Sequence, residues 1–515
     1  MPEDLPTEVV DPRAAGVVPG AGLSMYDRSW FGHPRGLGTL FFTEMWERFS
    51  YYGMRALLVL FMVDAVSGAN PGLGLSVSRA GAIYGLYTAM VYLMALPGGW
   101  IADKLWGQRK SVFVGGCIIA AGHFSMAIPT IASFYLGLGL IVIGTGLLKP
   151  NISAMVGDLY PDGGARRDAG FSIYYMGINL GGFLGPILCG LFGEGYNWHL
   201  GFSLAGIGMV AGLIQYRMGG KFLGTAGELA TDDDAATLVR RASNFYKTLA
   251  AVGVIVIAVV ALAFSGVIRI ALESVAQGLG ASIVVLAIVF FGYLLLAGGH
   301  TALEKKRLVV IFWLFLLAAI FWSGFEQAGS SLNLFAERLT DRVMFGWEAP
   351  ASTLQSINSF FIVVLAPVFA ILWTWLARRN ANPSMALKFA LGLLGLSIGF
   401  FVLAWGAANA TPENPVSPAW LVVTYFLHTC GELALSPVGL SSMTKLSPRG
   451  RVGQMMGVWF MAVALGSLFA GLAAGFLETL APSALFSNVA MIVGAAGLVA
   501  VVVSPFVKRL TGGVE

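Results

Sequence analysis

One stretch of this chain, Leu40 to Val63, is long and apolar enough to cross a bilayer as a helix, yet it is charged. Its four charges are Glu44, Glu47, Arg48 and Arg55. An ionised side chain near the bilayer centre costs about 2.5–3.5 kcal/mol even on insertion-based scales. At about 100° per residue, one narrow sector of the helix holds Glu44, Arg48, Tyr51 and Arg55. The stretch therefore predicts a polar stripe that faces water or charged partners.

Composition and periodicity extend this prediction to the whole chain. Hydrophobic residues make up 57% and charged residues 11% of the 515 positions, far from the values of a water-soluble domain. Runs of helix length predict fourteen membrane helices in groups of six, two and six. We expect them near residues 40–63, 80–101, 111–129, 134–158, 170–191, 199–217, 249–268, 281–298, 308–336, 351–376, 385–407, 418–444, 453–477 and 485–507. The fold class is an all-α polytopic membrane protein.

The positions of Lys and Arg predict the orientation. Placing both termini in the cytoplasm puts 23 of the 31 basic residues in the inner loops and four in the outer loops. We therefore expect a multi-pass protein of the cell membrane with both termini cytoplasmic. Two six-helix halves joined by a long cytoplasmic segment are typical of a major facilitator, whose halves rock about a site at their interface.

The same reading divides the chain into five parts. We expect a cytoplasmic lead over 1–38, a first bundle over 39–220, a linker with two additional membrane helices over 221–306, a second bundle over 307–508 and a cytoplasmic tail over 509–515. The linker carries three consecutive acids from Asp232, which indicates an aqueous segment before the two additional helices.

A polar turn between the second and third predicted helices contains a recurrent motif. Its residues are Gly99, Asp103, Lys104, Gly107, Gln108, Arg109 and Lys110, which resemble the Gly-x-x-x-Asp-Arg-x-Gly-Arg-Arg signature of the major facilitator superfamily. Glycine permits a tight turn, and one acid among several bases at a helix end can hold neighbouring helices together. We expect a conformational role for Gly99, Asp103 and Arg109.

Further charged residues lie inside other predicted spans. Glu47 and Lys149 fall at similar depth, eight to ten residues from the cytoplasmic helix ends, so a salt bridge between them is plausible. Arg55 and Glu326 both lie nearer the outer face. Glu432 is mid-span and precedes Pro437, which removes one backbone hydrogen bond beside the acid.

These charges are distributed unequally between the two halves. The first half has a surplus of one positive charge, whereas the second half offers two acids. A cationic wall opposite an anionic wall would complement a short zwitterion. The total is one negative charge, which a single proton neutralises, so proton coupling is chemically available.

Three separated segments carry a family resemblance. They are residues 44–55 (E-x-x-E-R-F-S-Y-Y-G-M-R), 171–186 (FSIYYMGINLGGFLGP) and 431–441 (GELALSPVGLS). They resemble the motifs of helices 1, 5 and 10 of the proton-dependent oligopeptide transporters, and the two additional helices are similar to those of bacterial members. The resemblance implies import of di- and tripeptides driven by the proton gradient, with no cofactor.

The resemblance also implies roles for individual residues. The proton-coupling set is Glu44, Glu47, Arg48, Lys149 and Glu326. The peptide-binding set is Arg48, Tyr51, Tyr52, Arg55, Lys149, Asn179, Trp322, Glu326, Asn358, Glu432 and Trp459. Two features depart from the family pattern. Ser359 follows Asn358 where many members have proline, and Thr88 follows Tyr87 where animal members have histidine, so coupling would rest on carboxylates.

Simpler interpretations stay open beside these. The acids and Arg48 of the first helix could merely neutralise one another, Lys149 could extend to the membrane surface, and Glu326 and Glu432 could pair with helix ends or each other. Tyr51, Tyr52, Trp322 and Trp459 could simply pack against other helices. We expect His123 and His428 to be buried structural residues. A runner-up function is a proton-linked carrier of another small organic anion or an amphipathic drug.

Other function classes lack their motifs. The sequence has no GxSxG elbow, HExxH helix or phosphate-binding loop, so we expect neither an enzyme nor direct ATP drive. We expect no metal and no nucleic acid partner, and a chain that works as a monomer in the lipid bilayer.

Overall fold

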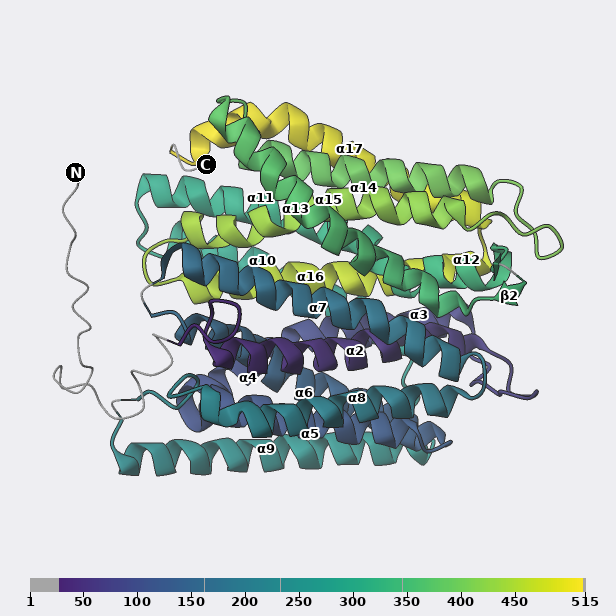
Figure 1. Ribbon diagram of the computed structural model, residues 1–515, viewed down its shortest axis with the longest axis horizontal. Coiled ribbons are helices and arrows are strands. Elements are labelled where there is room, and N and C mark those ends of the chain that lie inside the picture. Colours follow the sequence, from purple (N-terminus) through teal and green to yellow (C-terminus); the bar gives the residue numbers. More distant parts are fainter. Residues whose placement is uncertain (1–26, 162, 232, 345, 513–515) are drawn as a thin grey trace.

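The computed structural model describes residues 27–161, 163–231, 233–344 and 346–512. Most of the predicted lead, residues 1–26, and the last three residues of the predicted tail lie outside the described residues. The described chain is almost entirely helical, with long helices running side by side (Figure 1). Among the described residues, twelve helices are long and apolar enough to cross a membrane. The chain is therefore an all-helical polytopic membrane protein.

The first half and the middle of the chain contain the following elements. They are α2 (Arg35–Val63), α3 (Val77–Leu93), α4 (Ala95–Ile101), the π-helical η1 (Ala102–Trp106), α5 (Gln108–Met126), α6 (Ile131–Asp158), α7 (Gly164–Gly193), α8 (Trp198–Gly219), the 3₁₀ turn η2 (Gly220–Phe222), α9 (Ala235–Phe264) and α10 (Leu272–Leu296).

The second half contains the remaining elements. They are α11 (Ala302–Phe325), η3 (Glu326–Gly329), α12 (Ser331–Leu339), β1 (Val343–Met344), β2 (Trp347–Glu348), η4 (Ala351–Gln355), α13 (Ser356–Arg378), α14 (Met385–Ala407), α15 (Ala419–Leu446), α16 (Val452–Ala474), η5 (Gly475–Glu478) and α17 (Pro482–Leu510). β1 and β2 form a short antiparallel hairpin, which the all-α prediction did not include.

Local sequence explains where several helices begin. The side chains of Ser76, Thr130 and Ser384 each accept a hydrogen bond from a backbone N–H in the first turn of α3, α6 and α14. Thr301 and Glu304 form a full capping box at the start of α11. Such caps satisfy backbone donors that have no partner within the helix.

The two halves repeat one packing pattern. Helix α2 packs on α7 as α11 packs on α16, and α5 contacts α6 and α8 as α14 contacts α15 and α17. Between the halves, α3 packs on α16 and α7 packs on α13. Figure 1 shows the earlier half in purple to teal below the later half in green to yellow, and α2 begins at the same end of the bundle where α17 ends.

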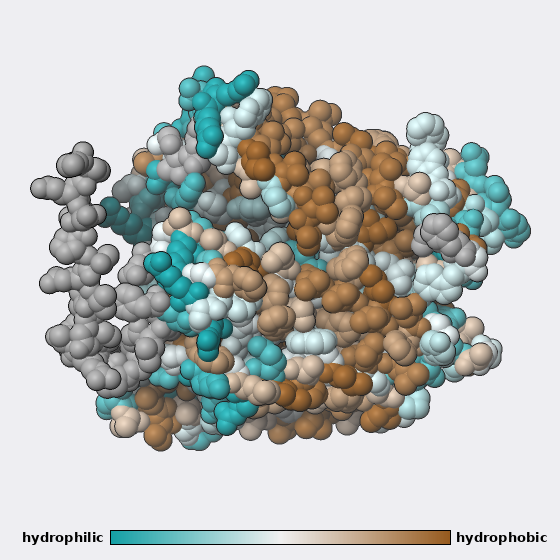
Figure 2. Space-filling model, viewed as in Figure 1, coloured by the Kyte–Doolittle hydropathy of each residue, from teal (hydrophilic) through white to brown (hydrophobic). Residues whose placement is uncertain are grey.

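The outer surface is apolar between two polar ends (Figure 2). Many large apolar side chains are exposed there, for example Ile257 and Val502, as expected of a surface that faces lipid. The most apolar stretch of α9 has no buried residue, and it lies at the margin of the bundle (Figure 1). Helix α10 instead packs against both α3 and α16, where Ala276 is buried.

Two predicted spans are interrupted. The span predicted over 308–336 is not one helix, because α11 ends at Phe325 and the backbone at Ser330 (φ −127°, ψ −95°) is not helical. Glu326 therefore lies on the 3₁₀ turn η3 between α11 and α12. The span predicted over 80–101 is divided at Met94 between α3 and α4.

Small residues bring α3 and α16 into backbone contact. A Cβ at Gly471 would collide with the carbonyl oxygen of Gly81 and lie 2.5 Å from the nitrogen of Gly85. Neither backbone atom can move without shifting its helix. The contact between the halves therefore depends on glycine at this position.

We expect Gly471→Ala to destabilise the fold by about 1–3 kcal/mol, because overpacking forces the two helices apart. The measurement is the thermal unfolding temperature of the protein in detergent. Gly292→Ala is the matched control, since a Cβ at Gly292 of α10 meets nothing within 4 Å. Equal unfolding temperatures for the two variants would contradict the packing argument.

Candidate functional site

A cavity of about 230 Å³ lies between the two halves. Its charged lining residues are Glu44, Arg48, Arg55, Lys149, Glu326 and Glu432. They come from α2 and α6 in the first half, and from η3 and α15 in the second half. Three carry positive and three carry negative formal charge. The charges that the sequence placed in separate spans thus converge on one cavity.

The first-helix acids share one arginine. The Nε of Arg48 lies 3.2 Å from Oε1 of Glu44 and also contacts the carboxylate of Glu47. All three side chains are buried, with exposed fractions of 3% or less. Glu47 stands behind Arg48 and does not line the cavity. Buried ions of opposite sign offset part of their desolvation cost when they pair in this way.

The predicted salt bridge between Glu47 and Lys149 is wrong for this conformation. Among the described residues, no ion pair within 4.0 Å includes Lys149. Its Nζ instead lies 4.4 Å from the ring centroid of Tyr92, within the cavity. The neighbouring Arg48 already holds Glu47, which explains why the lysine remains separate.

Arg55 and Glu326 meet at the other end of the cavity. Nη1 of Arg55 lies 3.0 Å from Oε2 of Glu326, and both side chains are buried. The break after Phe325 brings Glu326 to this position, where Tyr84 donates a hydrogen bond to its backbone oxygen at 3.2 Å. The structure thus joins the two halves through the pair that the sequence placed nearer the outer face.

Glu432 faces the cavity from α15 without a basic partner in the described part of the chain. Nδ2 of Asn358 lies 3.3 Å from Oε2 of Glu432 and donates to Oγ1 of Thr429 at 2.9 Å. Asn358 therefore reaches the acid even though Ser359, rather than proline, follows it. Pro437 lies inside α15, as the sequence predicts.

The remaining predicted contact residues divide into two groups. Tyr52, Asn179 and Trp322 line the cavity, but Tyr51 and Trp459 do not. Tyr51 is stacked on Tyr87, with ring centroids 6.3 Å apart, and lies below Arg48. Trp459 packs on Gly439 and Phe389 within the second half. In this conformation both rings fill helix contacts, and their role in peptide binding stays a prediction.

Several lining residues were not predicted to belong to the site. They are Tyr92, Tyr175, Gln355, Tyr425 and His428, and the last of these was expected only to pack. Among these five residues, only Tyr175 lies within a family-like segment, 171–186, and that position was the one sequence signal that could have identified it as a lining residue. Three buried nitrogens, Nη2 of Arg48, Nε1 of Trp322 and Nε2 of His428, have no hydrogen-bond partner among the described residues. These atoms could serve a polar ligand.

The site offers hydrogen bonds and charges rather than metal ligands. Within the described ranges, no cluster of three or more His, Cys, Asp or Glu side chains is placed to hold a metal ion. Opposite charges and unpaired nitrogens suit a small polar molecule that bears charges of its own.

One end of the cavity adjoins a second cavity of about 540 Å³, which shares Tyr175, Glu432 and Ser436 with it. The second cavity extends along α15 to Lys445, towards the end of the bundle where α2 begins. At the opposite end, Arg55 and Glu326 join the halves. The cavity is thus closed more firmly on one side than on the other.

Glu194, which the sequence analysis did not select, adds another polar contact between the halves at the closed end. Its carboxylate oxygens accept hydrogen bonds from the backbone nitrogens of Ala351 at 2.8 Å and Ser352 at 2.9 Å. Burial raises the pKa of the Glu194 carboxyl, and the hydrogen bonds from Ser352 and Ala351 oppose this only in part. The carboxyl therefore binds a proton more tightly here than it would in water.

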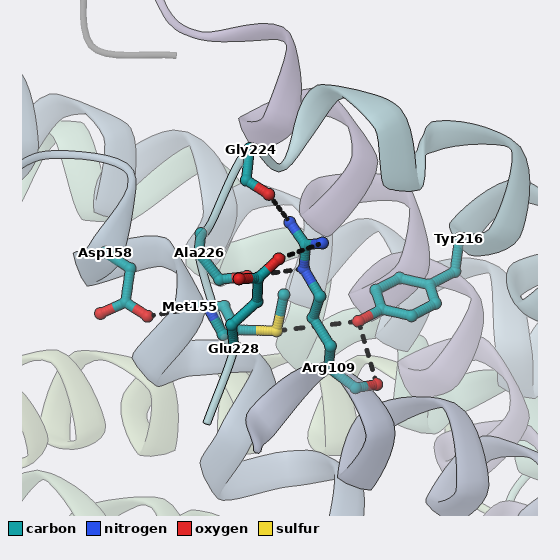
Figure 3. A network of polar contacts seen from close by, with 8 residues as sticks. Arg109, Met155, Asp158, Tyr216, Gly224, Ala226 and Glu228 are labelled. Carbon is teal, nitrogen blue, oxygen red and sulfur yellow. Dashed lines mark hydrogen bonds and ion pairs between the residues drawn. The ribbon is translucent and has the colours of Figure 1, made fainter. Parts of the chain in front are cut away.

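Arg109 organises the polar end of the first half (Figure 3). Its guanidinium donates to the backbone oxygens of Ala226 at 2.7 Å and Gly224, and lies 3.5 Å from Glu228. Tyr216 donates to the backbone oxygen of Arg109. The motif arginine thus holds the chain that follows η2 against the start of α5.

The other motif residues behave differently from Arg109. Gly107 has φ +74°, and a Cβ there would lie 2.8 Å from the nitrogen of Leu229, so Gly107 supplies the tight turn. A Cβ at Gly99 would meet nothing within 4 Å. Within the residues that the structure describes, Asp103 forms no ion pair. The conformational role of Gly99, Asp103 and Arg109 stays a prediction.

Two repeated helical halves around a charged cavity, enclosed by an apolar surface, define a membrane transporter with a major facilitator fold. The model of the POT family (PTR2) matches residues 109–492. Peptide transporter YePEPT of Yersinia enterocolitica subsp. palearctica is 41% identical over 504 residues, 95% of this chain and 97% of that protein. The di-/tripeptide transporter of Lactococcus lactis subsp. lactis is 39% identical, over 85% of this chain and 89% of its own.

Solved structures agree with these relatives. A crystal structure of peptide transporter POT in complex with sulfate matches with a TM-score of 0.87 and 40% identity, over 95% of this chain and 98% of that one. A POT family transporter in complex with 5-aminolevulinic acid matches with a TM-score of 0.85 and 33% identity, over 94% and 99%. The chain belongs to the POT family, which confirms the family resemblance and places it among transporters rather than enzymes.

We expect Glu194→Ala to increase the population opened at this end by roughly tenfold or more, because a carboxylate with two hydrogen bonds across the halves is lost. Spin labels at Tyr196→Cys and Glu413→Cys, with Cys117 replaced by serine, report the distance between the halves. Glu348→Ala is the control, since its exposed carboxylate pairs within the second half. An unchanged distance distribution for Glu194→Ala would refute the contact's role.

Proposed function

We propose that this protein is a proton-coupled symporter that imports di- and tripeptides by alternating access. The observation that carries the proposal is a pair of opposite charges, Lys149 from the first half and Glu432 from the second, which face one cavity and have no ion partner among the described residues. A peptide with free ends presents a carboxylate and an ammonium group. Lys149 would bind the carboxylate, and Glu432, held by Asn358, would accept the ammonium group.

Cavity size favours a short substrate. The volume of about 230 Å³ is below the range of roughly 300–1,000 Å³ that is usual for drug-sized ligands. Tyr52, Asn179 and Trp322 would contact the peptide backbone and side chains. The names of the Yersinia and Lactococcus relatives support peptides over the runner-up, a carrier of another small anion or an amphipathic drug.

The acids of α2 would couple transport to protons. Glu44 and Glu47 share Arg48, so the charges of the site sum to one negative charge that a proton would neutralise. Protonation would release Arg48 from one acid and leave it able to attract the peptide carboxylate, while Arg55 and Glu326 would act as the outer gate. One proton that crosses about 100 mV and one pH unit supplies about 3.7 kcal/mol, enough for roughly 500-fold accumulation.

The proposal includes a topology. Besides the twelve apolar helices, α2 and α5 would also cross the membrane, which gives fourteen spans as two six-helix bundles, over 39–220 and 307–508, with two additional helices between them. Both termini would lie in the cytoplasm, so the cavity would open inward. The protein would reside in the cell membrane and work as a monomer.

Uptake of labelled dialanine into proteoliposomes with an alkaline interior tests the proposal. The proposal also predicts the effect of Glu432→Gln on this uptake. Loss of the charged acceptor costs about 1.5–3 kcal/mol, so the apparent affinity for dialanine should fall roughly 10- to 100-fold. N-acetyl-dialanine lacks the ammonium group, so it should inhibit dialanine uptake with the same affinity in the wild type and in the variant. No proton-driven uptake by wild type would reject the function, and equal affinities for dialanine would reject the role of Glu432.

For Glu47→Gln we expect proton-driven accumulation to be lost and counterflow of dialanine to be kept, because the neutral amide removes the proton site but leaves the cavity intact. Counterflow and pH-driven uptake are measured in the same proteoliposomes. Glu413→Gln, an exposed acid in the loop before α15, is the control and should keep both activities. Unchanged pH-driven uptake by Glu47→Gln would refute the role of the cluster.

A further inference from the structure

A groove of about 630 Å³ lies between α2 and α8, at the end of the bundle where α2 begins and α8 ends. Its walls are mainly apolar and include Phe42, Ile214 and Met218, with exposed fractions of 40%, 56% and 71%. It lies on the outer surface of the first half, and none of the predicted site residues lines it. Transport by alternating access does not require such a groove.

Two basic side chains stand at the mouth of this groove, which we call the α2–α8 groove. The Cζ of Arg35 lies 5.5 Å and the Nζ of Lys221 lies 5.1 Å from the ring centroid of Phe222, so the two charges are less than about 11 Å apart. Among the described residues, neither takes part in an ion pair within 4.0 Å. Asp27 is near Arg35 and receives hydrogen bonds from Ser29 and from the backbone of Arg35, and the Nε of Arg35 donates to Oγ of Ser29 at 2.7 Å, which leaves the rest of its guanidinium for a ligand.

The groove also has a polar position at an intermediate depth. Oε1 of Gln215 accepts a hydrogen bond from Thr43 at 2.9 Å, and the amide nitrogen of Gln215 has no acceptor within the described ranges. Gln215 precedes Lys221 by six residues, which is about 9 Å along a helix. Trp30 lines the mouth, in the position that tryptophan favours at a membrane surface.

We propose that the α2–α8 groove binds an anionic phospholipid from the adjacent leaflet. Arg35 and Lys221 would bind the phosphate and headgroup, Gln215 would donate to an ester carbonyl, and an acyl chain would lie along Phe42 and Ile214. This order of cation, amide and apolar wall follows the order of groups in a phospholipid. A second copy of the chain fits less well, because two-fold pairing at this groove would bring like charges together.

Native mass spectrometry of the full-length protein tests the proposal, with phosphatidylglycerol and phosphatidylcholine of identical acyl chains as probes. We expect phosphatidylglycerol to bind more tightly, and Arg35→Gln/Lys221→Gln to weaken it by roughly 30-fold without changing phosphatidylcholine binding. Arg378→Gln/Arg379→Gln, which removes the same charge at the end of α13, is the matched control and should bind as wild type does.

Ile214→Trp provides a second variant that keeps both cations and fills the apolar wall, and it should also weaken phosphatidylglycerol binding. The thermal unfolding temperature in lipid-free detergent checks that each variant is folded. Equal affinity of wild type for the two lipids would overturn the proposal, as would equal losses in the groove and control variants. Complete displacement of the lipid by millimolar glycerol phosphate would overturn it too, because the site would then bind a free anion without its chain.

Discussion

The cost of removing ions from water determines where this helical bundle can be polar. The seven titratable side chains that the sequence analysis selected within the spans lie among helices whose outer faces are apolar, and each of them lines the central cavity or contacts a residue that does. Arg48 compensates two acids at once, and Arg55 compensates Glu326 across the two halves. Lys149 and Glu432 have no ion partner within the part of the chain that the structure describes, so they are the charges that gain most from a zwitterion.

Sequence patterns predicted the elements whose signal is strong and repeated. The apolar runs located the long helices, and the charges within them indicated a shared polar site, with Arg55 and Glu326 at similar depth nearer the outer face. The 3₁₀ break at Glu326 was not predicted, because Phe325 to Ser330 contains no proline and the single Gly329 is a weak signal for the end of a helix. The short hairpin before α13 was likewise too short to produce a period-two pattern.

Contacts within the site were harder to predict than membership of the site. Depth along a helix placed Glu47 and Lys149 at the same level, but depth alone does not show that Glu47 pairs with Arg48 rather than with Lys149. The family resemblance placed Tyr51 and Trp459 near the cavity, whereas their direction depends on packing against Tyr87 and Gly439. Glu194 follows the last residue of α7, and only the fold brings its carboxylate to the start of η4.

The position of α10 makes the two seams between the halves unequal. This helix contacts both α3 and α16, on the same side as the glycine contact between Gly81 and Gly471. Among the described residues, no additional helix of this kind bridges α7 and α13. Separation of α3 from α16 would detach α10 from one of its neighbours and expose the buried Ala276. If the two halves rotate against each other, the axis of that rotation should lie nearer the α3–α16 interface. The α7–α13 interface should then open the wider gap.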